Sequence, residues 1–224
     1  MRVILFGATG MVGQGVLREC LLSPDVTSVL TVGRRLSGQT HEKLQELTHS
    51  DFSDFTPLES KLTGFDACFF CLGVTSAGIS EAEYTRVTYG FTMAAASVLA
   101  PFNPGMTFIY VSGAGTDSSE RGRTMWARVK GRTENALLKQ PFKAVYMFRP
   151  GLIQPLPGIV SRTRLYRVLY TVMSPFLPLL KSLFPDSMTT TESVGRAMIY
   201  AARFGAPTPV LETRDINDLA AKAA

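Results

Sequence analysis

Short runs rich in β-branched and aromatic residues alternate with longer stretches of helical periodicity along the first two thirds of the chain. The runs predict strands at residues 3–6, 28–32, 46–49, 67–71, 107–111 and 143–148. The stretches between them predict helices at residues 11–22, 80–100 and 123–139. Strands separated by helices need crossover connections and therefore form a parallel sheet. We expect an α/β fold of the Rossmann type, with a doubly wound parallel sheet.

This alternation stops at Pro150, and prolines recur beyond it. Helical pieces are predicted at about 160–174 and 190–204, and a polar, alanine-rich tail follows them. No linker is long enough to separate two domains. We therefore expect a single domain over residues 1–224, made of a core at 1–155 and a small helical C-terminal appendage at 156–224 on the substrate side.

Composition supports one folded domain with an anionic partner. The chain has 224 residues, 46% hydrophobic and only 18% charged, which favours a full core over long disordered segments. Its net charge of +5 suits phosphate-bearing ligands, nucleic acid or an acidic membrane surface without choosing among them. Three cysteines make no disulfide framework, and Met1 and Arg2 lead directly into the first strand without a signal peptide. We expect a cytoplasmic protein.

The apolar segment within residues 160–184 raises the question of membrane contact. It carries Arg167 and Lys181 together with two prolines, whereas a spanning helix needs about 20 apolar residues with few charges. We expect no membrane span. Weak interfacial contact through 160–184 remains open beside the alternative of a buried helix or a lid over a pocket.

A glycine-rich turn, GATGMVG, directly follows the first predicted strand and leads into a helix. Gly7 permits the tight turn, Gly10 lets the backbone approach a pyrophosphate, and Gly13 lets the helix pack closely on the strand. The N-terminal N–H groups of that helix and its dipole attract the anion. Between a strand and a helix, this pattern predicts a dinucleotide site.

The end of the second predicted strand indicates which dinucleotide binds. Proteins that prefer NAD usually carry an acidic residue there, but this strand ends in Gly33, Arg34 and Arg35. Guanidinium groups pair with a 2′-phosphate through charge-assisted hydrogen bonds. We therefore predict NADP(H), preferred over NAD(H), with Arg34 favoured as the binder.

The pair Cys68 and Cys71 has the spacing of a metal or redox pair, but it predicts no metal site. Residues three apart on a strand point to opposite faces of the sheet. No second pair of ligands accompanies them, and the chain has only two histidines. We interpret both thiols as buried structural groups.

These segments resemble the short-chain dehydrogenase/reductase superfamily in its atypical or extended branch. The resemblance extends to the small NAD(P)-binding proteins that include the Tat-interactive-protein oxidoreductase homologues. It covers about residues 1–155 through the ordered motifs GATGMVG, TVGRR, FFCLGVTSAG, YVSGAG, VKGRTENAL and FRPGLIQP.

The resemblance implies site residues position by position. It places Ser112 at the catalytic site, Lys130 on the nicotinamide ribose, and Asp51 and Phe52 beside the adenine. The pyrophosphate would lie on Gly7, Thr9, Gly10, Met11 and Val12. The adenosine side would be lined by Leu72 and Gly73, and the nicotinamide by Pro150, Gly151 and Leu152.

The chain departs from the family pattern at Trp126. The family places a proton-transferring tyrosine four residues before the lysine, on the same helix face. Trp126 occupies that position, and its indole N–H cannot exchange a proton near neutral pH. Ser112, Lys130, a water molecule, Tyr166 or Tyr170 remain open as the donor, and a packing role for Trp126 remains open as well.

We therefore expect an NADP(H)-binding oxidoreductase of a small carbonyl compound. A non-catalytic NADP(H) sensor that acts through partners is the first alternative, and a sugar-nucleotide epimerase or dehydratase is the second. No nucleic-acid module accompanies the basic cluster at 121–132, so no nucleic acid is expected as a partner. The resemblance leaves a homodimer open, because helices like 80–100 and 123–139 often pair between subunits.

Overall fold

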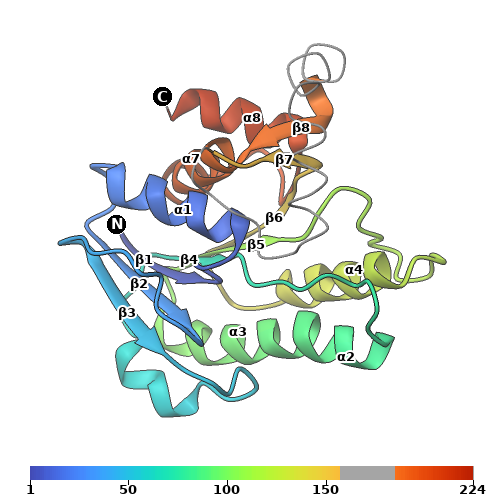
Figure 1. Ribbon diagram of the computed structural model, residues 1–224, viewed down its shortest axis with the longest axis horizontal. Helices are drawn as coiled ribbons and strands as arrows, with labels where there is room; N and C mark the ends of the chain where they lie inside the picture. The colour runs from blue at the N-terminus through green and yellow to red at the C-terminus, as the bar shows by residue number, and fades with distance from the viewer. Residues whose placement is uncertain (157–184, 224) are drawn as a thin grey trace.

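The computed structural model describes residues 1–156 and 185–223 and has three layers (Figure 1). Its middle layer is a seven-stranded sheet in the order β3-β2-β1-β4-β5-β6-β9, and every neighbouring pair is parallel. The strands are β1 (Arg2–Phe6), β2 (Ser28–Gly33), β3 (Leu44–Thr48), β4 (Ala67–Phe70), β5 (Thr107–Val111), β6 (Ala144–Arg149) and β9 (Val210–Glu212). The predicted Rossmann-type sheet is confirmed.

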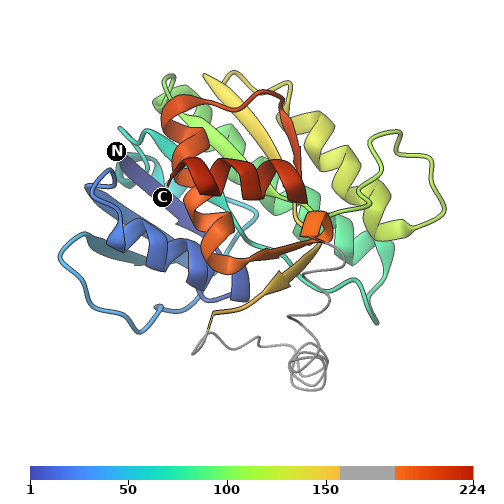
Figure 2. The ribbon, with the colours of Figure 1, turned by 90° about the horizontal axis from the view of Figure 1, so that it is seen from above.

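Helices cover both faces of this sheet (Figures 1 and 2). The face above the sheet in Figure 1 carries α1 (Met11–Leu22), α7 (Thr191–Phe204) and α8 (Thr213–Lys222). The opposite face carries a 3-10 helix (Thr56–Lys61), α2 (Glu81–Thr85), α3 (Phe91–Phe102) and α4 (Met125–Leu137). Both faces of the sheet are therefore buried, as all-parallel sheets require.

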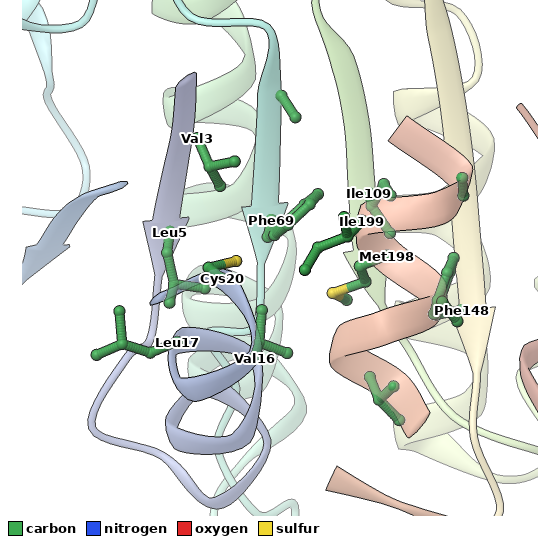
Figure 3. Packing of buried hydrophobic residues seen from close by; sticks show 14 of the residues in the cluster. Val3, Leu5, Val16, Leu17, Cys20, Phe69, Ile109, Phe148, Met198 and Ile199 are labelled. Atoms are coloured by element: carbon green, nitrogen blue, oxygen red, sulfur yellow. The ribbon is translucent and has the colours of Figure 1, made fainter. Parts of the chain in front are cut away.

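The two cores follow from the alternation of side chains along the strands. On β1, Val3 and Leu5 belong to the cluster beneath α1 and α7, whereas Ile4 and Phe6 belong to the cluster on the opposite face. Figure 3 shows the first cluster, in which residues of α1 and α7 cover the strands. Because all four side chains are fully buried, β1 anchors both layers.

The long helix predicted at 80–100 is divided in the structure. A π-helical turn (Arg86–Gly90) separates α2 from α3, and the N–H of Phe91 donates to the carbonyl of Arg86. A π turn adds one residue to the helical repeat, so a hydrophobic pattern with a period of 3.6 residues does not predict it. The predicted helix is therefore present from Glu81 to Phe102, with a π turn that the prediction did not include.

The C-terminal segment contributes more to the fold than a helical appendage. Strand β9 pairs with β6 at the edge of the main sheet, and the predicted tail forms α8. A second, two-stranded parallel sheet joins β7 (Leu152–Gln154) to β8 (Met188–Thr190), which follows a 3-10 turn (Pro185–Ser187). The helix predicted at 160–174 and the segment 160–184 proposed for membrane contact lie outside the described residues.

Helices α1 and α7 approach closely because glycines lie at their crossing. A Cβ atom on Gly15 would lie 2.4 Å from the Cβ of Thr191 and 2.8 Å from its carbonyl oxygen. A Cβ atom on Gly195 would lie 2.8 Å from Cγ of Glu19. Next to this contact the buried Glu19 pairs with Arg196 of α7 at 3.2 Å. The contact fixes the C-terminal layer on the N-terminal helix.

Substituting Gly15→Ala should destabilise the protein, because the new methyl group has no room between α1 and Thr191. Overpacking of this kind costs about 1–3 kcal/mol, partly offset by the better helix propensity of alanine. Urea denaturation followed by circular dichroism measures the change. Gly105→Ala is the matched control, since nothing lies within 4 Å of its Cβ position. Equal stability of the two variants would contradict this account of the crossing.

Candidate functional site

The glycine turn after β1 creates a bare anion-binding cradle. Gly7 has φ +82°, and a Cβ atom there would lie 2.7 Å from the backbone of Cys71 and Leu72. A Cβ atom on Gly13 would lie 2.0 Å from the carbonyl oxygen of Gly7. Helix α1 begins at Met11 with Gly10 as its N-cap, and no side chain caps it. Its first N–H groups therefore face a space free of side chains, which suits a pyrophosphate.

A cleft of about 660 Å³ opens at the carboxyl edge of the sheet, beside this turn. β1 lies between β2 and β4, so the strand order reverses here, which is where ligands bind in doubly wound sheets. The cleft is lined by Gly7, Thr9, Gly10, Met11, Val12, Arg34, Cys71, Leu72, Gly73, Val74, Thr75, Val111, Ser112, Lys130, Pro150, Gly151, Leu152 and Ile153. It brings together predicted residues from six separate segments of the chain.

A second hollow of about 350 Å³, which we call the arginine pocket, continues from the cleft. Both hollows share Gly7, Thr9, Arg34 and Leu72. The remaining residues of the arginine pocket are Ala8, Thr31, Val32, Gly33, Arg35 and Phe52. Both arginines are exposed, so their guanidinium groups are available to an anion. Together the two hollows border both the glycine turn and the two arginines, an arrangement suited to a dinucleotide.

Asp51 is not among the residues that line the arginine pocket, although its neighbour Phe52 is. Its carboxylate accepts hydrogen bonds from the N–H and the hydroxyl of Ser53, and these bonds hold the pKa of Asp51 below its usual range. Phe52 is buried against Phe55 and Phe91. The resemblance placed both residues beside the adenine, and the structure brings only Phe52 to the pocket.

Glu46 is a residue that the sequence analysis missed. It lies opposite Thr31 in the β2–β3 register and accepts hydrogen bonds from the Thr31 hydroxyl at 3.0 Å and the Ser37 N–H at 2.8 Å. These bonds hold the chain on both sides of Arg34 and Arg35. Glu46 lies fifteen residues after Thr31 along the chain. Only the parallel pairing of β2 with β3 brings its carboxylate to the end of β2.

Ser112 and Lys130 meet at the floor of the cleft. The N–H and the hydroxyl of Ser112 both donate to the carbonyl of Phe148, at 2.8 and 3.2 Å. The Lys130 ammonium donates to the carbonyl of Ser112. Burial lowers the pKa of Lys130 to about 8, against the opposing effect of the Glu134 carboxylate one turn later. A lysine in this range exchanges protons near neutral pH.

Trp126 lies one helical turn before Lys130 but is not among the residues that line the cleft. The half-buried indole lies beside the loop after β5, 3.6 Å from the Cβ position of Gly115. The structure therefore does not bring Trp126 together with Ser112 and Lys130. Within residues 1–156 and 185–223 no tyrosine lines the cleft, and Tyr166 and Tyr170 lie outside this range.

A buried ion pair supports the helix that carries Lys130. Glu134 is 1% exposed and binds Arg149 of β6 through both oxygens, Nη2–Oε2 at 2.5 Å and Nε–Oε1 at 3.1 Å. Arg149 also donates to the Ser118 hydroxyl and contacts Glu212 at 3.4 Å. The sequence motif contained Glu134 but gave no indication of its partner. This network joins α4, β6 and the start of α8.

The described cysteines do not form a metal site. Cys68 is buried in the cluster beneath α3, and Cys71 packs against the opposite cluster and lines the cleft. This confirms that the two thiols face opposite sides of the sheet. Within the described part of the chain, no three His, Cys, Asp or Glu residues gather as metal ligands, and no helix is long and apolar enough to cross a membrane.

Replacing Arg149 with methionine should strongly destabilise the protein, because Glu134 would remain as a buried and unpaired carboxylate. Breaking a buried pair in this way costs about 3–5 kcal/mol. The free energy of unfolding in urea measures the loss. Glu212→Gln removes the charge of the exposed partner of the same arginine, keeps an N-cap side chain of the same size on α8, and should change the stability by less than about 1 kcal/mol. A comparable loss in both variants would contradict the importance assigned to Glu134.

Comparisons with known proteins relate the chain to two groups. No family model matches the sequence. FMP52-2, mitochondrial, of Scheffersomyces stipitis is 31% identical over 153 residues, 66% of this chain and 65% of that protein. FMP52, mitochondrial, of Candida albicans is 27% identical over 157 residues, 68% of this chain and 67% of that protein. The aligned region thus spans about two thirds of these relatives' length.

Solved structures share the fold over nearly the whole chain. A short chain dehydrogenase family protein from Francisella tularensis superposes with a TM-score of 0.65 at 15% identity, covering 91% of both chains. The Bordetella bronchiseptica enzyme WbmF in complex with NAD⁺ has a TM-score of 0.68 at 16% identity, covering 99% of this chain and 77% of that one. These levels of identity establish the fold alone.

The relatives correct one prediction from the sequence. The expectation of a cytoplasmic protein is contradicted, because the curated relatives over most of the chain are named mitochondrial. The chain has the Rossmann-type fold seen in short-chain dehydrogenase structures, and its homologues include the FMP52 proteins.

Proposed function

We propose that the chain is an NADP(H)-dependent oxidoreductase that acts on a small carbonyl compound. One observation carries the proposal: the glycine turn, two exposed arginines and the Ser112–Lys130 pair border one continuous hollow at the carboxyl edge of the sheet. These groups match the successive parts of a dinucleotide: pyrophosphate, 2′-phosphate and nicotinamide ribose. The resemblance to the atypical short-chain reductases, including the Tat-interactive-protein homologues, supports the same assignment.

Each part of the cofactor would contact its own set of lining residues. The turn from Gly7 to Gly13 would hold the pyrophosphate on backbone N–H groups. The arginine pocket would take the adenosine end against Phe52 and Leu72, with Arg34 and Arg35 on the 2′-phosphate. Residues 150–152 would border the nicotinamide, which supplies or accepts a hydride when it is bound.

The chain's own residues would orient and polarise the substrate. Ser112 is held by two bonds to Phe148, so its carbonyl is a fixed point for the ammonium of Lys130. The partly buried ammonium would bind the ribose and stabilise negative charge on a reacting oxygen. In a low-dielectric cleft such a charge acts more strongly than in water.

The preference for NADP(H) follows from two guanidinium groups, whereas WbmF has been crystallised with NAD⁺ and NADH. Arg34→Gln should weaken NADPH binding about 10- to 100-fold, the value of one or two charge-assisted hydrogen bonds, and should leave NADH binding nearly unchanged. Isothermal titration with each cofactor measures this. Arg121→Gln, at an exposed arginine outside both hollows, is the control. Equal affinity of the unaltered protein for both cofactors would refute the preference.

A non-catalytic NADP(H) sensor is the second candidate, favoured by the position of Trp126 outside the cleft. A panel of aldehydes and ketones with NADPH separates the two functions. A reductase should show turnover that Lys130→Ala reduces at least about 100-fold, since general acid–base help is typically worth 10²–10⁴ in rate. Tight NADPH binding without turnover over the panel would favour the sensor. Turnover of nucleotide sugars without net NADPH oxidation would instead favour an epimerase.

A further inference from the structure

The proposed reduction needs a proton as well as a hydride, and the cleft holds few groups that could give one. Among the described residues that line it, the side chains with an exchangeable proton are Thr9, Thr75, Ser112, Cys71, Arg34 and Lys130. The family's tyrosine is replaced by Trp126, which lies beside Gly115 rather than in this lining. The candidate donors are therefore this set, the residues outside the described range, and a water molecule bound in the cleft.

Five of these six groups are poor donors at neutral pH. The aliphatic hydroxyls ionise only far above pH 7, and that of Ser112 is already bonded to Phe148. An arginine side chain cannot be deprotonated in a protein. Burial raises the pKa of the Cys71 thiol well above its usual range. Lys130 is left, and its Nζ lies on the Ser112 carbonyl at the floor of the cleft.

We propose that Lys130 is the proton donor of the cleft, taking the part of the missing tyrosine, and that Glu134 is a positioning residue that keeps Lys130 charged. This inference rests on the proposed reductase function and deepens it. When a carbonyl carbon gains the hydride, the π electron pair moves to oxygen. An O–H bond then forms as one N–H bond of Lys130 breaks. The neutral amine that remains takes its proton back from water, so charge and atoms balance.

The charged group that acts on Lys130 is a carboxylate. Glu134 on its own helix favours the ammonium, and this carboxylate is held in place by Arg149 of β6. Arg34 and the neutral Cys71 thiol line the cleft from the segments after β2 and β4. The described segment 150–153 contributes no ionisable side chain to the lining. Burial opposes Glu134, and the balance places the pKa of Lys130 at about 8.

The pH dependence of lysine acylation tests this charge balance without any turnover. The protein is pulsed with acetic anhydride over a pH series, and acetylation of Lys130 is compared by mass spectrometry with that of the exposed Lys139. Lys130 should react with a midpoint near 8, well below the pKa of about 10.4 that lysine has in model peptides. Saturating NADPH should slow the labelling of Lys130 alone. A midpoint for Lys130 like that of Lys139 would overturn the proposal.

The direction in which Glu134→Gln shifts the labelling midpoint of Lys130 tests the role of Glu134. Loss of the carboxylate should lower the Lys130 midpoint further, whereas a merely loosened fold would hydrate the ammonium and raise the midpoint towards that of Lys139. Glu212→Gln is the matched control, since Glu212 contacts the same arginine from an exposed position, and it should leave the midpoint unchanged. A raised midpoint in Glu134→Gln would overturn the role of Glu134. If this variant does not fold, the labelling midpoint of the unaltered protein still tests the proposal for Lys130.

Lys130→Arg separates charge from proton transfer. The variant keeps a cation and its donors but cannot release a proton, so NADPH affinity should persist while turnover falls about 10²- to 10⁴-fold. Tyr166→Phe and Tyr170→Phe should leave turnover unchanged. Turnover that survives Lys130→Arg would overturn the proposal; its loss in a tyrosine variant would then identify that tyrosine as the donor, and its survival in both would leave water as the donor. If the unaltered protein reduces no carbonyl, the reductase function fails, and the labelling midpoint still decides the charge of Lys130.

Discussion

The close approach of α1 to the end of β1 is the constraint on which the site depends. The Cβ position of Gly13 lies 2.0 Å from the carbonyl oxygen of Gly7, so only a hydrogen fits between the helix and the turn. This contact directs the uncapped N-terminus of α1 into the cleft. Because β1 is buried on both faces and flanked by β2 and β4, the turn sits where the strand order reverses. One local packing constraint thus fixes the position and the polarity of the anion cradle.

The end of the cleft that holds Lys130 depends on a different kind of interaction. Lys130 is placed by the buried pair of Glu134 and Arg149, which ties α4 to β6, and by the carbonyl of Ser112 at the end of β5. A buried ion pair fixes the positions of its side chains more reliably than it stabilises the fold, because the cost of desolvation offsets much of the attraction. Here it also supplies the negative charge that keeps the neighbouring ammonium protonated against burial. The same pair therefore links the fold to the chemistry that we propose.

Sequence patterns predicted what depends on neighbouring residues and missed what depends on pairing across the sheet. The glycine turn and the strands were predictable because their signals are local, and the cleft contains Ser112 and Lys130 as expected. The partner of Glu134 lies fifteen residues away on another element, and Glu46 reaches the end of β2 only through strand register. Helical spacing suggested that Trp126 and Lys130 share one environment. In the structure only Lys130 lines the cleft, and the indole of Trp126 lies against the loop after β5 near Gly115.

The central claim is that this edge of the sheet binds a reduced dinucleotide, and hydrogen–deuterium exchange with and without NADPH tests it most directly. The account predicts slower exchange in the turn at residues 7–13, in the loop at 33–37 that carries both arginines, and in the segment after β4 at 71–75. Amides at the far ends of α1 and α7, near Leu22 and Phe204, should be unaffected. Protection confined to those far ends, or no protection at saturating NADPH, would contradict the account.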